Sequence, residues 1–528
     1  MQRVTIYKSV LLAVIVLGLT SCGSGGGTDD FTGSSSSSSS SGSSSGGSSV
    51  STCPTNVQVD FCEATGNGMC RYVDPVSGDD SNAGTYDAPW RTLANVNTTI
   101  YNQYNAPGWV GLSPGDVVYL KSGVYSTIYH PGDDGGPDGG GSYIFHVQGV
   151  EGEVNAPITL TRFPGHHPII DPESLGIGIY VLYSRYINIS GIEVRNAYGA
   201  GIRVIGSESV NISFAEVHDN DGTVAANVAG IDIRTTKNAE VSNVVVYDNY
   251  DRTAADNDVQ THNSCNMVLF ANSGGIVVRD SVFYQTGDRN GQYSGCGLKY
   301  KHASPEPAST FEVRGNYFEN HKYFAIGLGT ANAHIHHNII NGAPEAIVDK
   351  DHGGPTHQNN QLFEYNTIYD ARGFFMSPTF DYVNAVNGPW PDVENIEFSG
   401  NVIVDLTDSY NSDRQVVNLN SYMPNELHDA LRSEISFENN CYYNPGATLS
   451  FGFAGADNYG SAGGYFDFQG WQTEYGFDSG SQVVDPLFND PSSLDFTLAA
   501  GSMCSGFGAY QGGYQPAMDR ESVFACEP

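Results

Sequence analysis

Short apolar segments recur along most of this chain at intervals that suit stacked β-strands. The shortest intervals between equivalent apolar positions are 22 and 23 residues, and the longer ones exceed that base by an insertion. Nine such positions align: Ile189, Ile212, Val241, Val278, Val313, Ile335, Phe363, Phe398 and Phe437. About twenty residues per repeat, with about three short strands in each, is typical of one rung of a parallel β-solenoid.

Polar turns separate the strands within each repeat. Runs such as Gly201–Val204 and Gly230–Ile233 are bounded by Asn, Gly and Asp, which favour turns. The later repeats carry one asparagine at an equivalent turn position: Asn316, Asn338, Asn366, Asn401 and Asn440. We expect these side chains to hydrogen-bond along the axis and to tolerate a left-handed turn conformation.

The N-terminus predicts export and lipid attachment. Two basic residues precede an apolar run at 10–19, which is too short to span a bilayer and is typical of a signal peptide. The run ends in Leu19-Thr20-Ser21-Cys22, which resembles a bacterial lipobox, so residues 1–22 are interpreted as a lipoprotein signal peptide with Cys22 as the lipid carrier. The alternative is an ordinary signal peptide with a chance cysteine.

Residues 23–51 are almost entirely Ser and Gly and have almost nothing apolar to bury, so they predict a flexible tether with a reach of about 30 Å. We therefore expect the domain at 52–528 to be lipid-anchored to the outer membrane of a bacterial cell envelope, exposed to the periplasm or the cell surface. No later apolar stretch is long enough for a transmembrane helix. We expect a monomer whose membrane contact is the lipid anchor alone.

The net charge limits the classes of binding partner, and the cysteine content predicts disulfides. A formal net charge of −35 argues against binding to nucleic acids or to anionic membranes. Eight cysteines remain after Cys22, and an even count in an exported protein predicts disulfides. Cys265 and Cys296 precede aligned strands on neighbouring rungs, where equivalent positions lie about 4.8 Å apart, so we expect them to pair. We expect the other six cysteines to form disulfides at the two ends of the domain.

Both ends of the repeat region resemble a known superfamily. The motifs are VSGDDSNAGT at 76–85, PWRTL at 89–93, PGDVVYLKSGVY at 114–125, DPLF at 485–488 and DFTL at 495–498. The first three are similar to the opening of secreted right-handed β-helix proteins, and the last two resemble their final rung. The resemblance implies that residues 71–515 form an all-β, single-stranded right-handed parallel β-helix with an N-terminal cap. Members include polysaccharide lyases (family nine among them), glycoside hydrolases and non-catalytic surface proteins, so the scaffold does not choose the activity.

Candidate chemistry gathers on one strand, Gly297–His302, where Lys299 and Lys301 share a face. The chain has seven lysines, and these two lie within about fifty residues of Lys322 and Lys350. Neighbouring rungs are predicted to extend the lysine face as a column: Asp232 and Arg234, then Leu269 and Ala271, then the lysines, then Gly327 and Gly329, then Asp349–His352. The glycines would leave room for a sugar ring, which makes Gly327, Gly329, Lys350 and His352 predicted substrate contacts. The register of the last rung stays open, because Ala346-Ile347-Val348 permits either face.

This lysine pair suits β-elimination from a uronate, which needs a base for the proton α to the carboxylate and cations for the charge that develops. Either Lys299 or Lys301 would be the base, with its pKa lowered by desolvation and by cationic neighbours. The other lysine, or Arg234, would hold the carboxylate. The alternative is a structural role in which the lysines pair with Asp232 and Asp349.

An acidic segment precedes the lysine strand and carries Asp248, Asp251, Asp256 and Asp258. Hard oxygen ligands on a loop suit Ca²⁺. Family-nine lyases combine an aspartate-rich calcium site with a lysine base in a later rung, so the resemblance implies calcium here, with Lys299 or Lys301 in the lysine role. The segment departs from the family in lacking two consecutive aspartates. Aspartate-rich turns without a metal are the alternative.

Three histidines, His262, His302 and His352, follow the expected edges of the groove, and any of them could protonate the leaving oxygen or contact substrate. A lone histidine is more often a hydrogen-bonded surface residue. His334 and His336 share a strand face, but the sequence shows no third ligand, so zinc is not expected.

Two other functional classes compete with the lyase. A glycoside hydrolase needs two carboxyl groups about 5–9.5 Å apart, which Asp232, Asp349 and Asp351 would supply across the groove. A binding or adhesion solenoid would need neither the lysine pair nor the glycines. Because the lysines cluster, we rank the lyase first, the hydrolase second and the binding protein third. The sequence does not specify which polysaccharide is the substrate.

Overall fold

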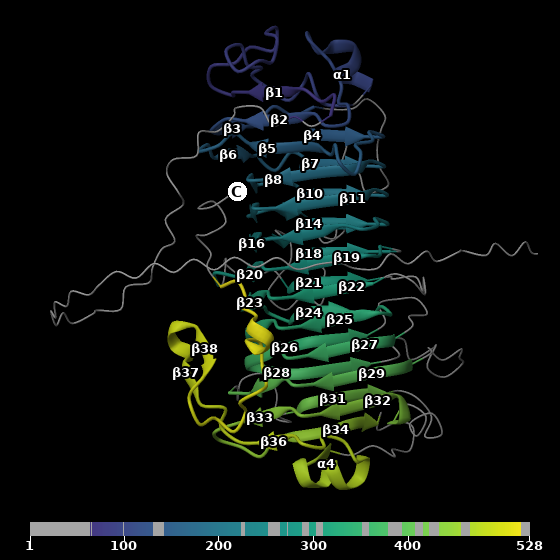
Figure 1. Cartoon of the computed structure of the whole chain (residues 1–528), viewed down its shortest axis with the longest axis vertical. Helices are drawn as coiled ribbons and strands as arrows, with labels where there is room; N and C mark the ends of the chain where they lie inside the picture. The colour runs from purple at the N-terminus through teal and green to yellow at the C-terminus, as the bar shows by residue number, and fades with distance from the viewer. Residues whose placement is uncertain are drawn as a thin grey trace, which may run out of the picture. The chain divides into compact units, whose positions relative to one another are not determined.

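The computed structural model describes residues 64, 66–98, 100–129, 142–222, 228–251, 264–271, 273–287, 295–301, 310–350, 358–377, 393–406, 415–421, 432–455 and 465–518. Residues 53–528 form one compact unit. The described strands stack as the rungs of a parallel β-helix, from β1 at one end to β34 and helix α4 at the other (Figure 1). No helix among these residues is both long enough and apolar enough to cross a bilayer.

Face A of the β-helix is a sheet of twelve parallel strands. Its strands are β1 (Cys70–Val73), β2 (Val117–Leu120), β5 (Ile158–Arg162), β8 (Arg185–Ser190), β11 (Glu208–Ser213), β15 (Glu240–Ser242), β19 (Ile276–Arg279), β22 (Phe311–Arg314), β25 (Ala333–His336), β27 (Gln358–Glu364), β29 (Val393–Ser399) and β32 (Ile435–Glu438). The nine apolar positions aligned from the sequence are direct register partners here, from Ile189 to Phe437. The predicted period is therefore confirmed strand by strand.

Face B is the second wall. Its strands are β4 (Tyr143–Gln148), β7 (Ile177–Leu182), β10 (Ala200–Ile205), β14 (Ala229–Arg234), β18 (Cys265–Phe270), β21 (Cys296–Lys301), β24 (Phe324–Leu328), β26 (Ile339–Lys350), β28 (Thr367–Ser377), β31 (Gln415–Ser421) and β34 (Ser450–Gly455). Each pairs in parallel with the next.

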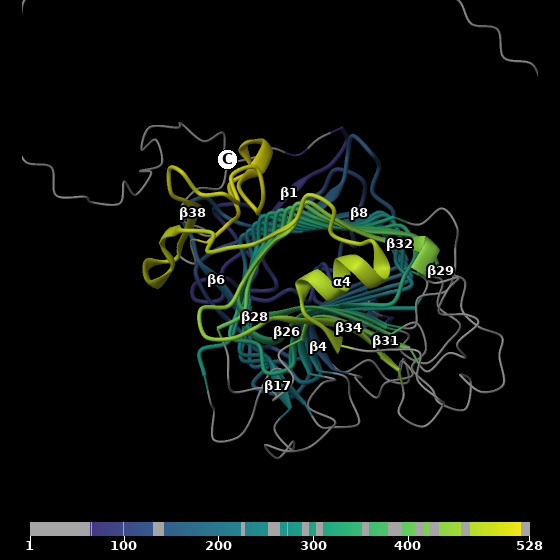
Figure 2. The ribbon, with the colours of Figure 1, turned by 90° about the horizontal axis from the view of Figure 1, so that it is seen from below.

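Face C is the third wall, with β3 (Gly123–Tyr125), β6 (Pro168–Ile170), β9 (Glu193–Arg195), β12 (Glu216–His218), β16 (Val245–Tyr247), β20 (Val282–Tyr284), β23 (Tyr317–Glu319), β30 (Val402–Val404), β33 (Cys441–Tyr443) and β36 (Gln482–Val483). The long strands β26 and β28 run round the corner and pair with strands of both walls, so faces B and C join into one sheet. A two-strand ladder, β13 (Asp221–Gly222) with β17 (Tyr250–Asp251), stands beside this corner (Figure 2).

The interior is a continuous apolar column of inward-facing side chains from all three faces. Phenylalanines on successive rungs of face A stack ring on ring, with 4.6 Å between the centroids of Phe363 and Phe398 and 4.5 Å between Phe398 and Phe437. Helix α4 (Phe468–Tyr475) lies across the open end of the stack and buries Trp471 there (Figure 2). The short helix α1 (Ile100–Asn105) and buried Trp90 stand at the opposite end, where the sequence predicted a cap.

The asparagine ladder predicted from the sequence is present. Each amide from Asn316 to Asn401 donates to the side-chain oxygen of the next, over 3.0 Å in every step. The left-handed conformation was expected at these asparagines, but it lies one residue earlier, as at His337 and Tyr365. The asparagine side chain instead bonds main-chain groups at the turn, as where Asn338 donates to the carbonyl oxygens of Val313 and His336.

Replacing Asn366 by alanine should lower the free energy of unfolding by about 3 kcal/mol, because buried main-chain groups lose their partners. Its side chain accepts from the Asn338 main chain and donates to the Ile335 carbonyl. Urea unfolding measures the change. Asn211→Ala is the matched control, because Asn211 donates to Asn188 on the exposed outer surface and should cost under about 0.5 kcal/mol. Equal losses in the two variants would contradict this account of the ladder.

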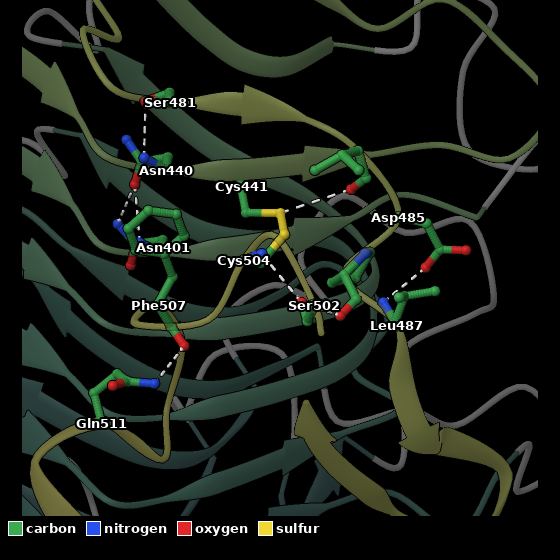
Figure 3. The surroundings of a disulfide bond; sticks show 12 residues. Asn401, Asn440, Cys441, Ser481, Asp485, Leu487, Ser502, Cys504, Phe507 and Gln511 are labelled. Carbon is green, nitrogen blue, oxygen red and sulfur yellow. Dashed lines mark hydrogen bonds between the residues drawn. A yellow bond between two sulfur atoms is a disulfide. The ribbon is translucent and has the colours of Figure 1, made fainter. Parts of the chain in front are cut away.

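The C-terminal strap, residues 484–518, leaves the last rung and returns along the outside of the stack (Figure 1). Its main chain bonds to Tyr442, then Gly400, then Gly315, which are successively earlier rungs. A disulfide between Cys441 and Cys504 fastens it to β33 beside the asparagine ladder (Figure 3). The motifs at 485–488 and 495–498 were expected to form a final rung. They lie instead in this strap, which contains the antiparallel pair β37 (Phe488–Asp490) and β38 (Asp495–Leu498) and the turns Pro491–Ser493 and Gln511–Gly513.

The disulfide predicted between Cys265 and Cys296 is confirmed. The two residues are register partners on β18 and β21, so the sheet itself brings them together. Cys70 is also disulfide-bonded, near the N-terminal end of the stack. Cys22, Cys53, Cys62 and Cys526 lie outside the described residues.

Candidate active site on face B

Cations concentrate on the outer surface of face B, where four consecutive strands, β10, β14, β18 and β21, stack. The parallel register sets two outward columns: Arg203, Asp232, Val268, Lys299 and Gly327 in one, and Ile205, Arg234, Phe270 and Lys301 in the other. The predicted relation of Asp232 and Arg234 to the two lysines is therefore correct. The chain has a net charge of −35, so a surface with four cationic side chains and one carboxylate is opposite in sign to the chain as a whole.

Asp232 is held between two arginines. Its Oδ2 lies 2.9 Å from Arg203 Nε and 2.7 Å from Arg234 Nη2, and its Oδ1 accepts from Arg234 Nε over 2.8 Å. The carboxylate is fully buried, and an ion of this kind is tolerated only when it is paired. Asp232 therefore serves to fix the two guanidinium groups and is poorly suited to proton transfer.

The two lysines stand on the outer side of the sheet yet are nearly inaccessible, with 2 % exposure for Lys299 and 7 % for Lys301. Lys301 Nζ lies 5.8 Å from the Phe270 ring centroid, and Arg234 Cζ lies 5.5 Å from the same ring. Burial, and then the charge of Arg234, lower the pKa of Lys301 to about 8, while Asp232 acts in the opposite direction. Near pH 8, therefore, about half of Lys301 is neutral.

One rung of the predicted column is shifted by a residue. The strand before the lysines was expected to present Leu269 and Ala271, but Val268 and Phe270 face outward and Leu269 lies in the core. A slip of one residue moves every side chain to the opposite face of a strand. The apolar sequence of β18 contains no polar alternation that would have fixed its register.

The predicted room for a sugar above Gly327 is filled. Gly327 is the register partner of Lys299, as expected, but a Cβ added to it would lie 2.4 Å from the Phe324 ring. That ring occupies the space beside Lys299, with 5.9 Å between its centroid and Lys299 Nζ. Gly329 is buried and follows the end of β24. Glycine at 327 therefore accommodates a phenylalanine and not a substrate.

Asp349 points into the β-helix, contrary to its predicted place in the groove. It pairs in register with the core residues Leu328 and Met376 and is 2 % exposed. Burial raises its pKa to about 7, and the amides of Gln358 and Gln361 partly offset this. Because Asp232 faces outward and Asp349 inward, the sheet separates the two carboxyl groups. They cannot flank one glycosidic bond, so this predicted hydrolase pair is wrong.

Calcium was predicted at four aspartates, of which two are described. Both carboxylate oxygens of Asp248 already accept hydrogen bonds from Thr286, over 2.9 and 2.6 Å, and Asp251 is buried in β17. The strand next to the lysines, β18, offers Val268 and Phe270 on this face and no oxygen-bearing side chain. The other two predicted ligands, Asp256 and Asp258, lie outside the described residues, so the calcium site stays a prediction.

Some predicted site residues fall in parts of the chain that the structure does not describe. Outside the described residues lie Asp256, Asp258, His262, His302, Asp351 and His352. Lys350 ends β26, but its side chain is not described.

Two members of the cluster were not predicted. Arg203 lies in a Gly-Ile-x-hydrophobic strand 29 residues before the one that carries Asp232, and aligning these two repeats would have found it. Phe270 was missed through the register slip on β18. The structure thus adds two contacts to this site: Arg203 on the Asp232 carboxylate, and the Phe270 ring beside Lys301 and Arg234.

Two family models match the chain. The model described as Pel9A-like, right handed beta helix region covers residues 71–263, and the model for the general right handed beta helix region covers residues 177–362. Among curated proteins, a lacto-N-biosidase of Bifidobacterium longum subsp. longum is 30% identical over 100 residues, which is 19% of this chain and 5% of that protein.

Among solved structures, the chain is similar to pectate lyase Pel9A, with 17% identity and a TM-score of 0.42, covering 82% of this chain and 90% of that one. A GH136 lacto-N-biosidase from Eubacterium ramulus has 13% identity and a TM-score of 0.42, covering 79% of this chain and 68% of that one. The strand pairing and the two family models agree on the architecture. The chain is therefore a right-handed parallel β-helix protein whose first rungs match the Pel9A-like type.

Proposed function

We propose that this protein is a carbohydrate-active enzyme that cleaves an acidic polysaccharide by β-elimination at face B. Two features of one surface carry the proposal. Lys299, Lys301 and Arg234 lie together on the outer side of face B, and the pKa of Lys301 is lowered to about 8. A base that is partly neutral near physiological pH, beside fixed cations, is what proton removal next to a carboxylate requires. The match to a Pel9A-like region supports this class.

The roles divide between the two lysines. Neutral Lys301 takes the proton from the carbon α to the uronate carboxylate, and a double bond forms between that carbon and the β carbon. The glycosidic C–O bond at the β carbon breaks, and the leaving oxygen takes up a proton from water. Lys299 and Arg234 carry the positive charge that stabilises the carboxylate and its enolate-like form. Because both lysines are nearly inaccessible, a polymer must displace neighbouring residues to reach them.

A glycoside hydrolase is the second candidate, favoured by the 100-residue similarity to a lacto-N-biosidase. It would require carboxyl groups other than the pair Asp232 and Asp349, with Asp351 as one untested choice. A binding protein without chemistry is the third candidate. The cellular setting belongs to the same proposal: Cys22 carries a lipid, residues 23–51 form the tether, and the monomeric β-helix works at the outer membrane surface.

Incubation with pectic, alginate and sulfated algal polymers separates the three classes. The lyase produces unsaturated ends that absorb in the ultraviolet, a hydrolase produces reducing ends without that absorbance, and a binder produces neither. Adding a chelator and then restoring Ca²⁺ tests the metal in the same assay. Activity that survives chelation would remove calcium from the proposal, and reducing ends without absorbance would remove the lyase.

A further inference from the structure

A cluster of histidines and glutamates stands on the outer surface of face A, where β22, β25 and β27 are adjacent (Figure 1). The central strand β25 contributes His334 and His336, two residues apart. Glu312 comes from β22 on one side, and Glu364 comes from β27 on the other. The sequence showed no third ligand for the two histidines, because Glu312 and Glu364 belong to different rungs.

The side chains meet across the diagonals of this patch. His336 Nε2 lies 3.1 Å from Glu312 Oε1, and His334 Nε2 lies 2.8 Å from Glu364 Oε2. The two imidazole rings stack with 3.9 Å between their centroids. Ligand atoms of Glu312, His334 and His336 all lie within 4.8 Å of one another. Small side-chain rotations would bring three such atoms round a single ion.

The surroundings prepare His336 to act as a ligand. His336 Nδ1 lies 2.7 Å from His337 Nδ1, which can accept a hydrogen bond from the His336 Nδ1–H group and so leave the His336 Nε2 lone pair for a metal. The Tyr514 ring of the C-terminal strap stacks on His337 at 3.9 Å and fixes that partner. Arg314, with Nε 3.1 Å from Glu312 Oε1, is the cation with which a metal would compete.

We propose that Glu312, His334 and His336 bind one divalent transition-metal ion of the Zn²⁺ class, with Glu364 orienting His334 or supplying a fourth ligand. Two imidazole nitrogens and one carboxylate form a donor set that suits zinc, whereas calcium prefers oxygen ligands alone. The ion would tie the adjacent strands β22 and β25 of face A together, and β27 as well where Glu364 supplies the fourth ligand. This site lies on face A, whereas the lysines lie on face B. A failure of the proposed reaction would therefore leave the metal proposal unaffected.

The test is calorimetric titration of the full chain with ZnCl₂, together with Co²⁺ as a spectroscopic probe. The wild type should bind one equivalent at this site and should give cobalt absorption bands in the visible range. His334→Gln removes a ligand whose side chain is 38 % exposed, so the fold should survive, and it should weaken that binding at least about tenfold and remove the bands. Glu312→Gln, also on the surface, should do the same.

His167→Gln is the matched control, because His167, Glu193 and Glu216 form another described group able to hold a metal. It should leave the equivalent assigned to His334 intact. Zinc binding that is unchanged in both His334→Gln and Glu312→Gln, or absent at millimolar zinc, would overturn the proposal. Loss of the only zinc equivalent in His167→Gln would overturn it as well.

Discussion

Replacing Lys301 by alanine should reduce turnover of the cleaved polysaccharide by about 10² to 10⁴-fold, the usual contribution of a positioned general base. Lys301→Arg should not restore activity, because a guanidinium keeps its proton at any working pH. Lys299→Ala should also lower kcat, since it removes a cation from the developing charge. Ultraviolet absorbance of the unsaturated product measures all three variants.

The role of Lys301 as a base also predicts the direction in which activity changes with pH. Lys301 acts only when neutral, and its pKa is lowered to about 8, so activity should rise with pH through about 8 and then level off. Lys237→Ala, which changes an exposed lysine elsewhere on the stack, is the matched control and should keep full activity. If Lys299→Ala and Lys301→Ala both keep full activity, the lyase proposal fails and other carboxylates must be sought.

Replacing Asp349 by asparagine should stabilise the protein above pH 7, the reverse of the usual effect of a core substitution. The pKa of this carboxyl group is about 7 in the folded chain against an ordinary value of 3.8. Folding therefore favours its protonated form, and the stability it contributes is complete below pH 4 and is lost as the pH rises through 7. At pH 8 the gain in unfolding free energy from asparagine should reach up to about 4 kcal/mol.

Urea unfolding at two pH values tests this prediction. At pH 4 the variant and the wild type should have nearly equal stability, and at pH 8 the variant should be the more stable. Asp87→Asn, at an exposed position, is the control and should change stability little at either pH. A variant that is less stable than the wild type at pH 8 would contradict the placement of Asp349 inside the β-helix. Because Asp349 points into the β-helix whereas the lysines face outward, its replacement should also leave polysaccharide cleavage intact.

The repeat period by itself determined the architecture of the described rungs. Apolar residues at a spacing of 22 residues or more can bury one face only by stacking, and every aligned position on face A proved to be a register partner of the next. The same reasoning found the asparagine ladder and the disulfide between Cys265 and Cys296, since equivalent positions on neighbouring rungs must lie one strand spacing apart.

Only the tertiary structure decided which way individual side chains face where the sequence lacks alternation. The end of strand β18 and the segment 346–348 of β26 are apolar at both parities, so neither the outward place of Phe270 nor the inward place of Asp349 could be read from them. The ring over Gly327 belongs to a neighbour three residues away in the same strand, and its direction depends on packing.

Contacts between rungs also required the structure. An insertion separates Arg203 from Asp232, whereas the strands that carry Glu312 and His336 lie one minimal repeat apart. In both pairs the contact depends on the stacking register and on side-chain reach. The sequence at 485–498 resembles a rung, yet it packs against earlier rungs as part of the strap that Cys504 fastens in place. Periodicity thus sets which strands are neighbours, and three-dimensional packing sets which of their side chains act together.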